Sequence, residues 1–139
     1  MPLPDDETEL PATGPQAMLV DDQLGFEIDF FERILRRNPR HLDALRRQVQ
    51  LLAETGRHHD ALLLDQRLVD LRPEDCVAHY NMACSLSMVG RLNEALASLD
   101  NALRLGYRDI AHLMDDPDLD PLRNDPRYVE LIAKIDVRC

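Results

Sequence analysis

Aromatic residues, glycine and long apolar runs are all scarce in this 139-residue chain. It has no Trp, three Phe, three Tyr and five Gly. Its apolar content comes largely from Ala and Leu, which favours helices packed on helices over a β-sheet. No apolar run approaches the roughly 20 residues that a membrane-spanning helix needs. We therefore expect a helical protein of one ordinary domain with no transmembrane helix.

Basic residues are also few and do not cluster. The chain has 16 Lys and Arg against 26 Asp and Glu, which gives a net charge of −10. Residues 1–25 carry six acids and no base, whereas residues 26–105 carry twelve acids and eleven bases. Because no basic stripe is present to neutralise phosphates, the composition argues against nucleic acid and an anionic membrane as partners.

The three cysteines, Cys76, Cys84 and Cys139, do not form a disulfide framework. Cys76 and Cys84 lie on one predicted helix and are roughly 12 Å apart along its axis. That separation is too long for a disulfide bond. Unpaired cysteines are typical of a reducing compartment, and residues 1–10 contain no basic, apolar leader. We therefore predict a cytoplasmic protein.

A spacing of 34 residues recurs through the middle of the chain. A fixed period of this length is typical of stacked helix pairs, in which each repeat contacts its neighbours. Three dipeptides show it: Asn38-Pro39 recurs as Arg72-Pro73, Gly56-Arg57 as Gly90-Arg91, and Ala61-Leu62 as Ala95-Leu96.

Within each unit, apolar residues recur every three or four positions, which is the period of an α-helix. Gly56, Gly90 and Gly106 follow predicted helices, where a left-handed residue commonly ends the helix. Residues 1–21 contain four prolines and several acids, and they predict a flexible tail. The expected helices run from Asp22 up to Pro39, over 41–54, 58–71, 76–89, 92–105 and 109–114, and from Asp125 onward.

These units resemble the tetratricopeptide repeat (TPR), a helix–turn–helix motif of 34 residues. In the better match, residues 76–109, the small residues that the family places where its helices cross are Ala83, Ala95 and Ala102. The tryptophan that the family favours is absent. The resemblance implies an all-α fold, a right-handed superhelix of antiparallel helix pairs. Its parts are a half repeat at 22–40, repeats at 42–75 and 76–109, and a closing unit at 110–136, in one domain over residues 22–139.

In the family, the first helix of each pair lines a concave groove that binds the partner. Since guanidinium groups bind carboxylates and tyrosine is a frequent interface anchor, we hypothesise that an acidic or C-terminal peptide occupies this groove. The alternative is that Arg46 and Arg47 pair with Asp43 or Glu54 on their own helix. The resemblance implies these groove residues: Arg46, Arg47, Gln50, Tyr80, Asn81, Cys84 and Met88.

One TPR subclass clamps the terminal carboxylate of chaperone peptides, and Arg46, Gln50 and Asn81 resemble the first part of that clamp. The positions that would complete it hold Ala111 and Asp115. Because a carboxylate at Asp115 repels a peptide terminus, we do not assign the chain to this subclass.

No spacing of residues indicates catalysis or a metal site. Asp116, Asp118 and Asp120 alternate as in a calcium loop, but Pro121 stands where that loop needs glycine. Arg127 stands where it needs a bidentate glutamate. We interpret the segment as acidic turns that cap short helices. We therefore expect no metal, no cofactor and no enzymatic activity.

The expected function is that of a non-enzymatic adaptor or scaffold, whose groove binds a peptide or protein surface. One alternative is a dedicated chaperone that resembles the small, acidic TPR chaperones of secretion systems. The other is an accessory of a larger assembly such as a cytoskeletal filament, as in kinesin light chains, although their repeat is longer. Exposure of Phe26, Phe30 or the last helix would allow the chain to form homo-oligomers.

Overall fold

The computed structural model describes residues 22–138, without the side chains of residues 136–138. Helices joined by short turns make up this part of the chain, and none of its residues lies in a β-strand. None of these helices is long and apolar enough to cross a bilayer. The predicted tail at residues 1–21 lies outside the described residues, as does Cys139.

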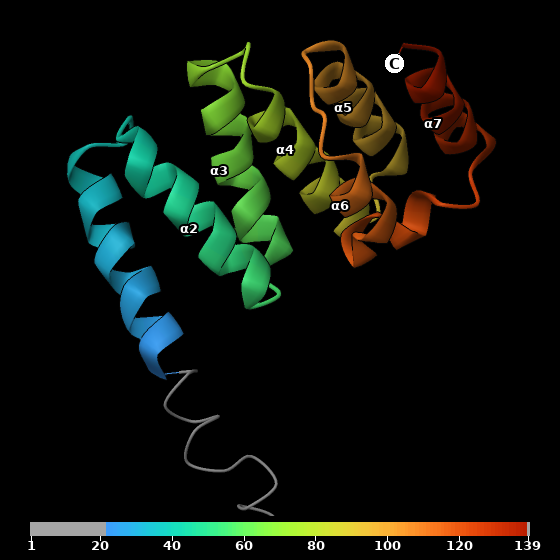
Figure 1. Cartoon of the computed structure of the whole chain (residues 1–139). Helices are drawn as coiled ribbons and strands as arrows, with labels where there is room; N and C mark the ends of the chain where they lie inside the picture. The colour runs from blue at the N-terminus through green and yellow to red at the C-terminus, as the bar shows by residue number, and fades with distance from the viewer. Residues whose placement is uncertain (1–21, 139) are drawn as a thin grey trace, which may run out of the picture.

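The helices follow one another across the molecule in chain order, each turning back on the one before it (Figure 1). Two antiparallel pairs, α2 with α3 and α4 with α5, stack against each other through α3 and α4. This arrangement confirms the predicted all-α array of helix pairs. The elements are a helix at residues 22–37, α2 (Leu42–Glu54), α3 (His58–Leu71), α4 (Cys76–Met88), α5 (Leu92–Arg104), α6 (Ile110–Asp115), η1 (Pro117–Leu122) and α7 (Pro126–Arg138).

The turns that follow α2 and α4 have the same geometry. Gly56 and Gly90 have φ angles of 78° and 86°, which a residue without a side chain adopts at little cost. The next residue then donates its backbone N–H back to the helix, which satisfies a carbonyl that the helix end would leave unpaired. The two bonds, 34 residues apart, are Arg57 N to Leu52 O at 2.8 Å and Arg91 N to Leu86 O at 2.9 Å.

The acidic segment that the sequence predicts as turns forms a 3₁₀-helix, η1. The Asp116 side chain caps this helix by accepting a hydrogen bond from the Asp118 backbone N–H at 3.0 Å. Pro117 occupies the first position, where no donor is required. Leu119 and Leu122 are fully buried against the repeats, and this burial holds the short helix in place.

The alanines that the repeat pattern marks are fully buried between the helices. The side chain of Ala95 has no exposed surface, and the same is true of Ala61, its equivalent in the preceding unit. A methyl group lets two helix backbones come close, and surrounding leucines fill the remaining space at the density of a protein interior. Ala83 and Ala102 are also fully buried. The small-residue pattern in the sequence therefore marks positions in the core of the helix stack.

We expect Ala95→Leu to lower the free energy of unfolding by about 1 to 3 kcal/mol, because three extra carbons have no space at the crossing. Ala97→Leu makes the same change on the exposed side of α5 and serves as the matched control. Urea unfolding followed by circular dichroism measures both. Equal stability of the two variants would contradict the packing described here.

A carboxyl group is buried where α3 meets α4. Asp65 has no exposed surface, and its Oδ2 accepts a hydrogen bond from the Ser85 hydroxyl at 2.5 Å. The other oxygen, Oδ1, has no hydrogen-bond partner within the described residues. Burial raises the pKa of Asp65 from 3.8 to about 7, although the bond from Ser85 acts in the opposite direction. Folding therefore favours the protonated form of this side chain.

A raised carboxyl pKa makes the folded state bind a proton that the unfolded state has released, so stability falls as pH rises toward 7. Between about pH 5 and about pH 8 we expect Asp65 to remove about 2 to 3 kcal/mol of folding free energy. The folding free energy of Asp65→Asn, whose side chain carries no charge, should fall by correspondingly less over the same pH range. Urea unfolding of both proteins at the two pH values measures the difference, and parallel pH profiles would refute it.

Candidate functional site

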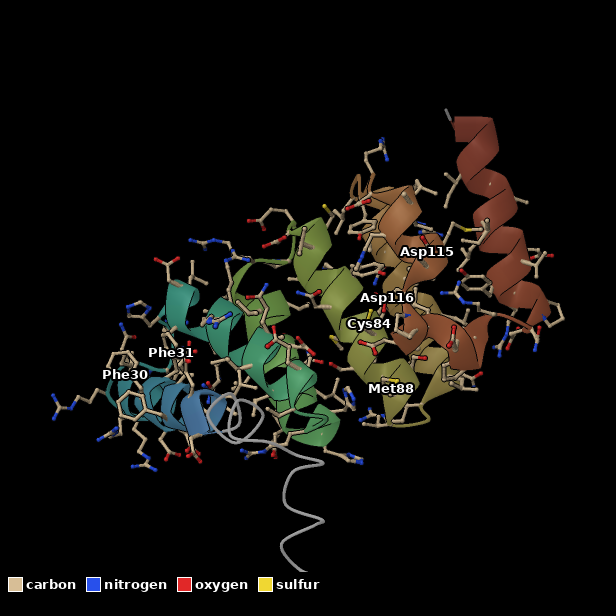
Figure 2. The ribbon with its side chains drawn as sticks, turned by 60° about the horizontal axis from the view of Figure 1, so that its bottom comes forward. Phe30, Phe31, Cys84, Met88, Asp115 and Asp116 are labelled. Atoms are coloured by element: carbon tan, nitrogen blue, oxygen red, sulfur yellow. The ribbon has the colours of Figure 1, made fainter. Side chains whose placement is uncertain are left out.

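An open cavity of about 300 Å³ lies between α2, α4 and the segment that joins α6 to η1. We call it the α2–α4 pocket. Figure 2 shows Cys84 on α4 beside Asp116, which begins η1, near the middle of the molecule. We call residues 110–122, which comprise α6 and η1, the closing segment. The polar lining comes from all three sides and includes Gln50 and Glu54 of α2, Tyr80, Asn81 and Cys84 of α4, and His112, Asp116 and Asp118 of the closing segment.

The structure brings together four of the seven residues predicted for the groove. Gln50, Tyr80, Asn81 and Cys84 all line the α2–α4 pocket. Met88 is exposed at the end of α4 and is not part of the lining. Tyr80 and Cys84 are mostly buried and form the floor, whereas Gln50 is exposed at the rim.

The two predicted groove arginines do not line the pocket, because each links neighbouring helices. Arg46 forms an ion pair of 2.6 Å with Asp75, the residue that caps α4. Arg47 forms one of 3.0 Å with Glu27 on the first helix. Neither partner lies on the arginines' own helix, so the alternative pairing with Asp43 or Glu54 is wrong. Both guanidinium groups are thus paired within the chain, which removes the main support for an acidic peptide as the occupant.

Asp116 is the centre of the pocket floor. Its Oδ2 accepts a hydrogen bond of 2.7 Å from the Tyr80 hydroxyl and lies 3.5 Å from the Cys84 sulfur. The same oxygen is 3.3 Å from Nε2 of His112. The floor therefore combines a hydroxyl, a thiol, an imidazole and carboxylates from α4, α6 and η1. Asp115, which stands at a position of the peptide clamp, is exposed and does not line the pocket, whereas its neighbour Asp116 is buried there.

Burial and negative charge keep the thiol on the floor protonated. Burial raises the pKa of Cys84 far above its usual range, and the Asp116 and Asp118 carboxylates raise it further. Burial also raises the pKa of the Tyr80 hydroxyl, and it raises the pKa of Asp118. Because the thiolate is the reactive form of cysteine, this environment opposes nucleophilic chemistry at Cys84.

Arg123 holds the closing segment in place, and no spacing in the sequence marks it. Its guanidinium donates to the backbone oxygen of Asp116 at 2.5 Å and to the Tyr128 hydroxyl at 2.8 Å. It also pairs with Asp120 at 2.9 Å. These bonds join α6, η1 and α7, so Arg123 fixes the side of the pocket that Asp116 occupies.

Comparison with known proteins finds a partial relative by sequence and the same fold in solved structures. No family model matches. The chain is 32% identical over 87 residues to a chloroplastic protein of Arabidopsis thaliana, and the match covers 60% of this chain and 26% of that protein. The chain thus spans about a quarter of that relative's length.

Two solved structures share the fold. "MamA 41-end from Desulfovibrio magneticus RS-1" superposes with a TM-score of 0.62 and 15% identity, covering 90% of this chain and 73% of that one. "MamA RS-1 ArsTM double mutant" gives 0.61 and 17%, covering 89% and 74%. The chain has a TPR-like helical fold. This TPR-like fold places the first helices of both pairs, α2 and α4, on the walls of the pocket.

We expect the bond between Tyr80 and Asp116 to contribute about 1 to 3 kcal/mol to stability, because it pairs a buried hydroxyl with a carboxylate. A double-mutant cycle with Tyr80→Phe, Asp116→Asn and the double variant isolates that energy. Urea unfolding of the four proteins provides the data. Additive losses from the two single substitutions would show that the two side chains are not coupled.

Proposed function

We propose that this chain is a non-enzymatic interaction module, which holds a segment of a partner protein in the α2–α4 pocket. The observation that supports this most directly is the open cavity between the first helices of the two repeats, lined by four residues that the TPR resemblance implies for binding. The TPR-like fold itself favours a preformed surface, so this chain loses little conformational entropy when the partner binds.

Two amide side chains at the pocket are suited to backbone recognition. Gln50 on α2 and Asn81 on α4 both line it; Gln50 is exposed and Asn81 is half-buried. An amide offers both donors and an acceptor. It can therefore bind the N–H and C=O groups of an extended segment, which is a common basis of peptide recognition.

The charge of the lining disfavours an acidic partner segment. Glu54, Asp116 and Asp118 contribute carboxylates, and within the described residues no Lys or Arg lines the pocket. A partner carboxylate would meet like charges there, whereas donor groups and basic side chains would be attracted. We therefore replace the acidic or C-terminal peptide hypothesis with a segment that carries hydrogen-bond donors or positive charge.

A benzophenone amino acid placed at Gln50 should cross-link the partner when the chain is expressed in its native host. The same group placed at the exposed Asn101 on α5, a second helix, should not give that product. Gel analysis and mass spectrometry identify the adduct. Equal labelling from both positions would overturn the pocket as the binding surface. A single partner at fixed stoichiometry would favour the dedicated chaperone among the alternatives.

Once the partner is known, Asn81→Ala should weaken its binding about tenfold, which is about 1.4 kcal/mol for one lost amide contact. Asn101→Ala removes an identical side chain from α5 and should leave the affinity unchanged. Isothermal titration calorimetry compares the two variants. An unchanged affinity for Asn81→Ala would remove the amide from the recognition surface.

A further inference from the structure

Three side chains with sulfur and oxygen ligand atoms meet on the floor of the α2–α4 pocket, and an imidazole lies beside one of them. The Cys84 sulfur and carboxylate oxygens of Asp116 and Asp118 all lie within 4.8 Å of one another. His112 adds an imidazole nitrogen beside Asp116. Sulfur and nitrogen donors distinguish this set from an ordinary acidic cluster. A set of thiol, imidazole and carboxylate is the one that zinc and similar transition metals prefer.

Two separations, both measured from Oδ2 of Asp116, are those of ligands around one zinc ion. Tetrahedral zinc with ordinary bond lengths places a thiolate sulfur and a carboxylate oxygen about 3.5 Å apart, and an imidazole nitrogen and a carboxylate oxygen about 3.3 Å apart. In this structure Cys84 Sγ lies 3.5 Å, and His112 Nε2 lies 3.3 Å, from Oδ2 of Asp116. An Asp118 oxygen lies within 4.8 Å of both the Cys84 sulfur and an Asp116 oxygen, so small side-chain movements bring the three together on one ion. The exposed His112 side chain turns toward them to complete the set.

The carboxylate at the centre of the set is already held in position. Asp116 is buried, its Oδ1 accepts the Asp118 backbone N–H, and its Oδ2 accepts the Tyr80 hydroxyl. In metal sites, hydrogen bonds of this kind orient the ligands and are nearly as important as the ligands themselves. The cavity also opens to solvent, which gives an ion a path to the floor.

We propose that Cys84, His112, Asp116 and Asp118 form a binding site for a divalent transition metal, with zinc as the best fit. On binding, the sulfur–metal bond forms as the Cys84 thiol releases its proton to solvent. The dication makes this possible because its charge offsets the carboxylates that keep the thiol protonated in the metal-free protein. The ion then joins α4 to α6 and η1, and thereby fixes the wall of the pocket. Two carboxylates and a thiolate around a dication leave one net negative charge, so the pocket still disfavours an acidic partner. The site does not depend on the proposed function, because the metal alone is its ligand.

The first experiment uses cobalt as a spectroscopic substitute for zinc. In the full chain with Cys76→Ser and Cys139→Ser, Cys84 is the remaining thiol. Addition of Co²⁺ to this protein should give the visible absorption of a tetrahedral ion and a thiolate-to-metal charge-transfer band, both removed by an equivalent of Zn²⁺. Adding Cys84→Ser should abolish the charge-transfer band. If the protein that retains Cys84 shows no charge-transfer band with Co²⁺, the proposal is wrong.

Zinc affinity, measured by competition with a chromophoric chelator, gives the second test. We expect Cys84→Ser and Asp118→Asn each to weaken zinc binding at least about 100-fold, whereas Cys76→Ser, on the same helix, leaves it unchanged. Zinc should also raise the melting temperature, because it binds the folded state alone. Circular dichroism confirms that each variant folds. Equal affinity for Zn²⁺ and Ca²⁺, with no effect of Cys84→Ser, would reduce the cluster to a nonspecific acidic surface.

Discussion

The burial of α4 on nearly every side is the constraint on which the other features depend. This helix lies against α3, α5 and η1, so its polar side chains are removed from water along with its apolar ones. A buried polar group is costly unless it finds a partner. Ser85 pairs with Asp65 of α3, and Tyr80 pairs with Asp116 of the closing segment. His79 meets the backbone oxygen of Pro73 at 2.8 Å. Each bond fixes a different neighbour of α4.

The closing segment is the part of the fold that converts a stack of helix pairs into a pocket. Leu113, Leu119 and Leu122 have no exposed surface, and they extend the core of the second repeat beyond α5. Arg123 then ties the backbone of this segment together. Because apolar burial and hydrogen bonds act on the same short stretch, Asp116 points to α4 in a fixed orientation. A continued regular repeat would place a longer helix there, with different side chains facing the pocket.

The first helix, residues 22–37, has one side for packing and one for solvent. Ile28 and Leu35 are buried against α2 and its partner helix, whereas Phe26 and Phe30 keep 66% and 47% of their surface exposed. Figure 2 shows Phe30 at one end of the molecule, away from Cys84 and Asp116 of the pocket. Phe30 and Phe31 contact each other edge to face, with ring centroids 5.2 Å apart. Self-association through this surface stays a prediction.

The amino-acid sequence by itself determined the repeating architecture. The 34-residue spacing, the glycines after the helices and the buried alanines are local or periodic signals, and each is physically tied to a helix end or a crossing. The tertiary structure alone decided which side chains share the pocket. Cys84 and Asp116 are 32 residues apart and belong to different repeats, so no spacing rule joins them. The same holds for Arg46 with Asp75, because an arginine's partner depends on how one helix pair is rotated against the next.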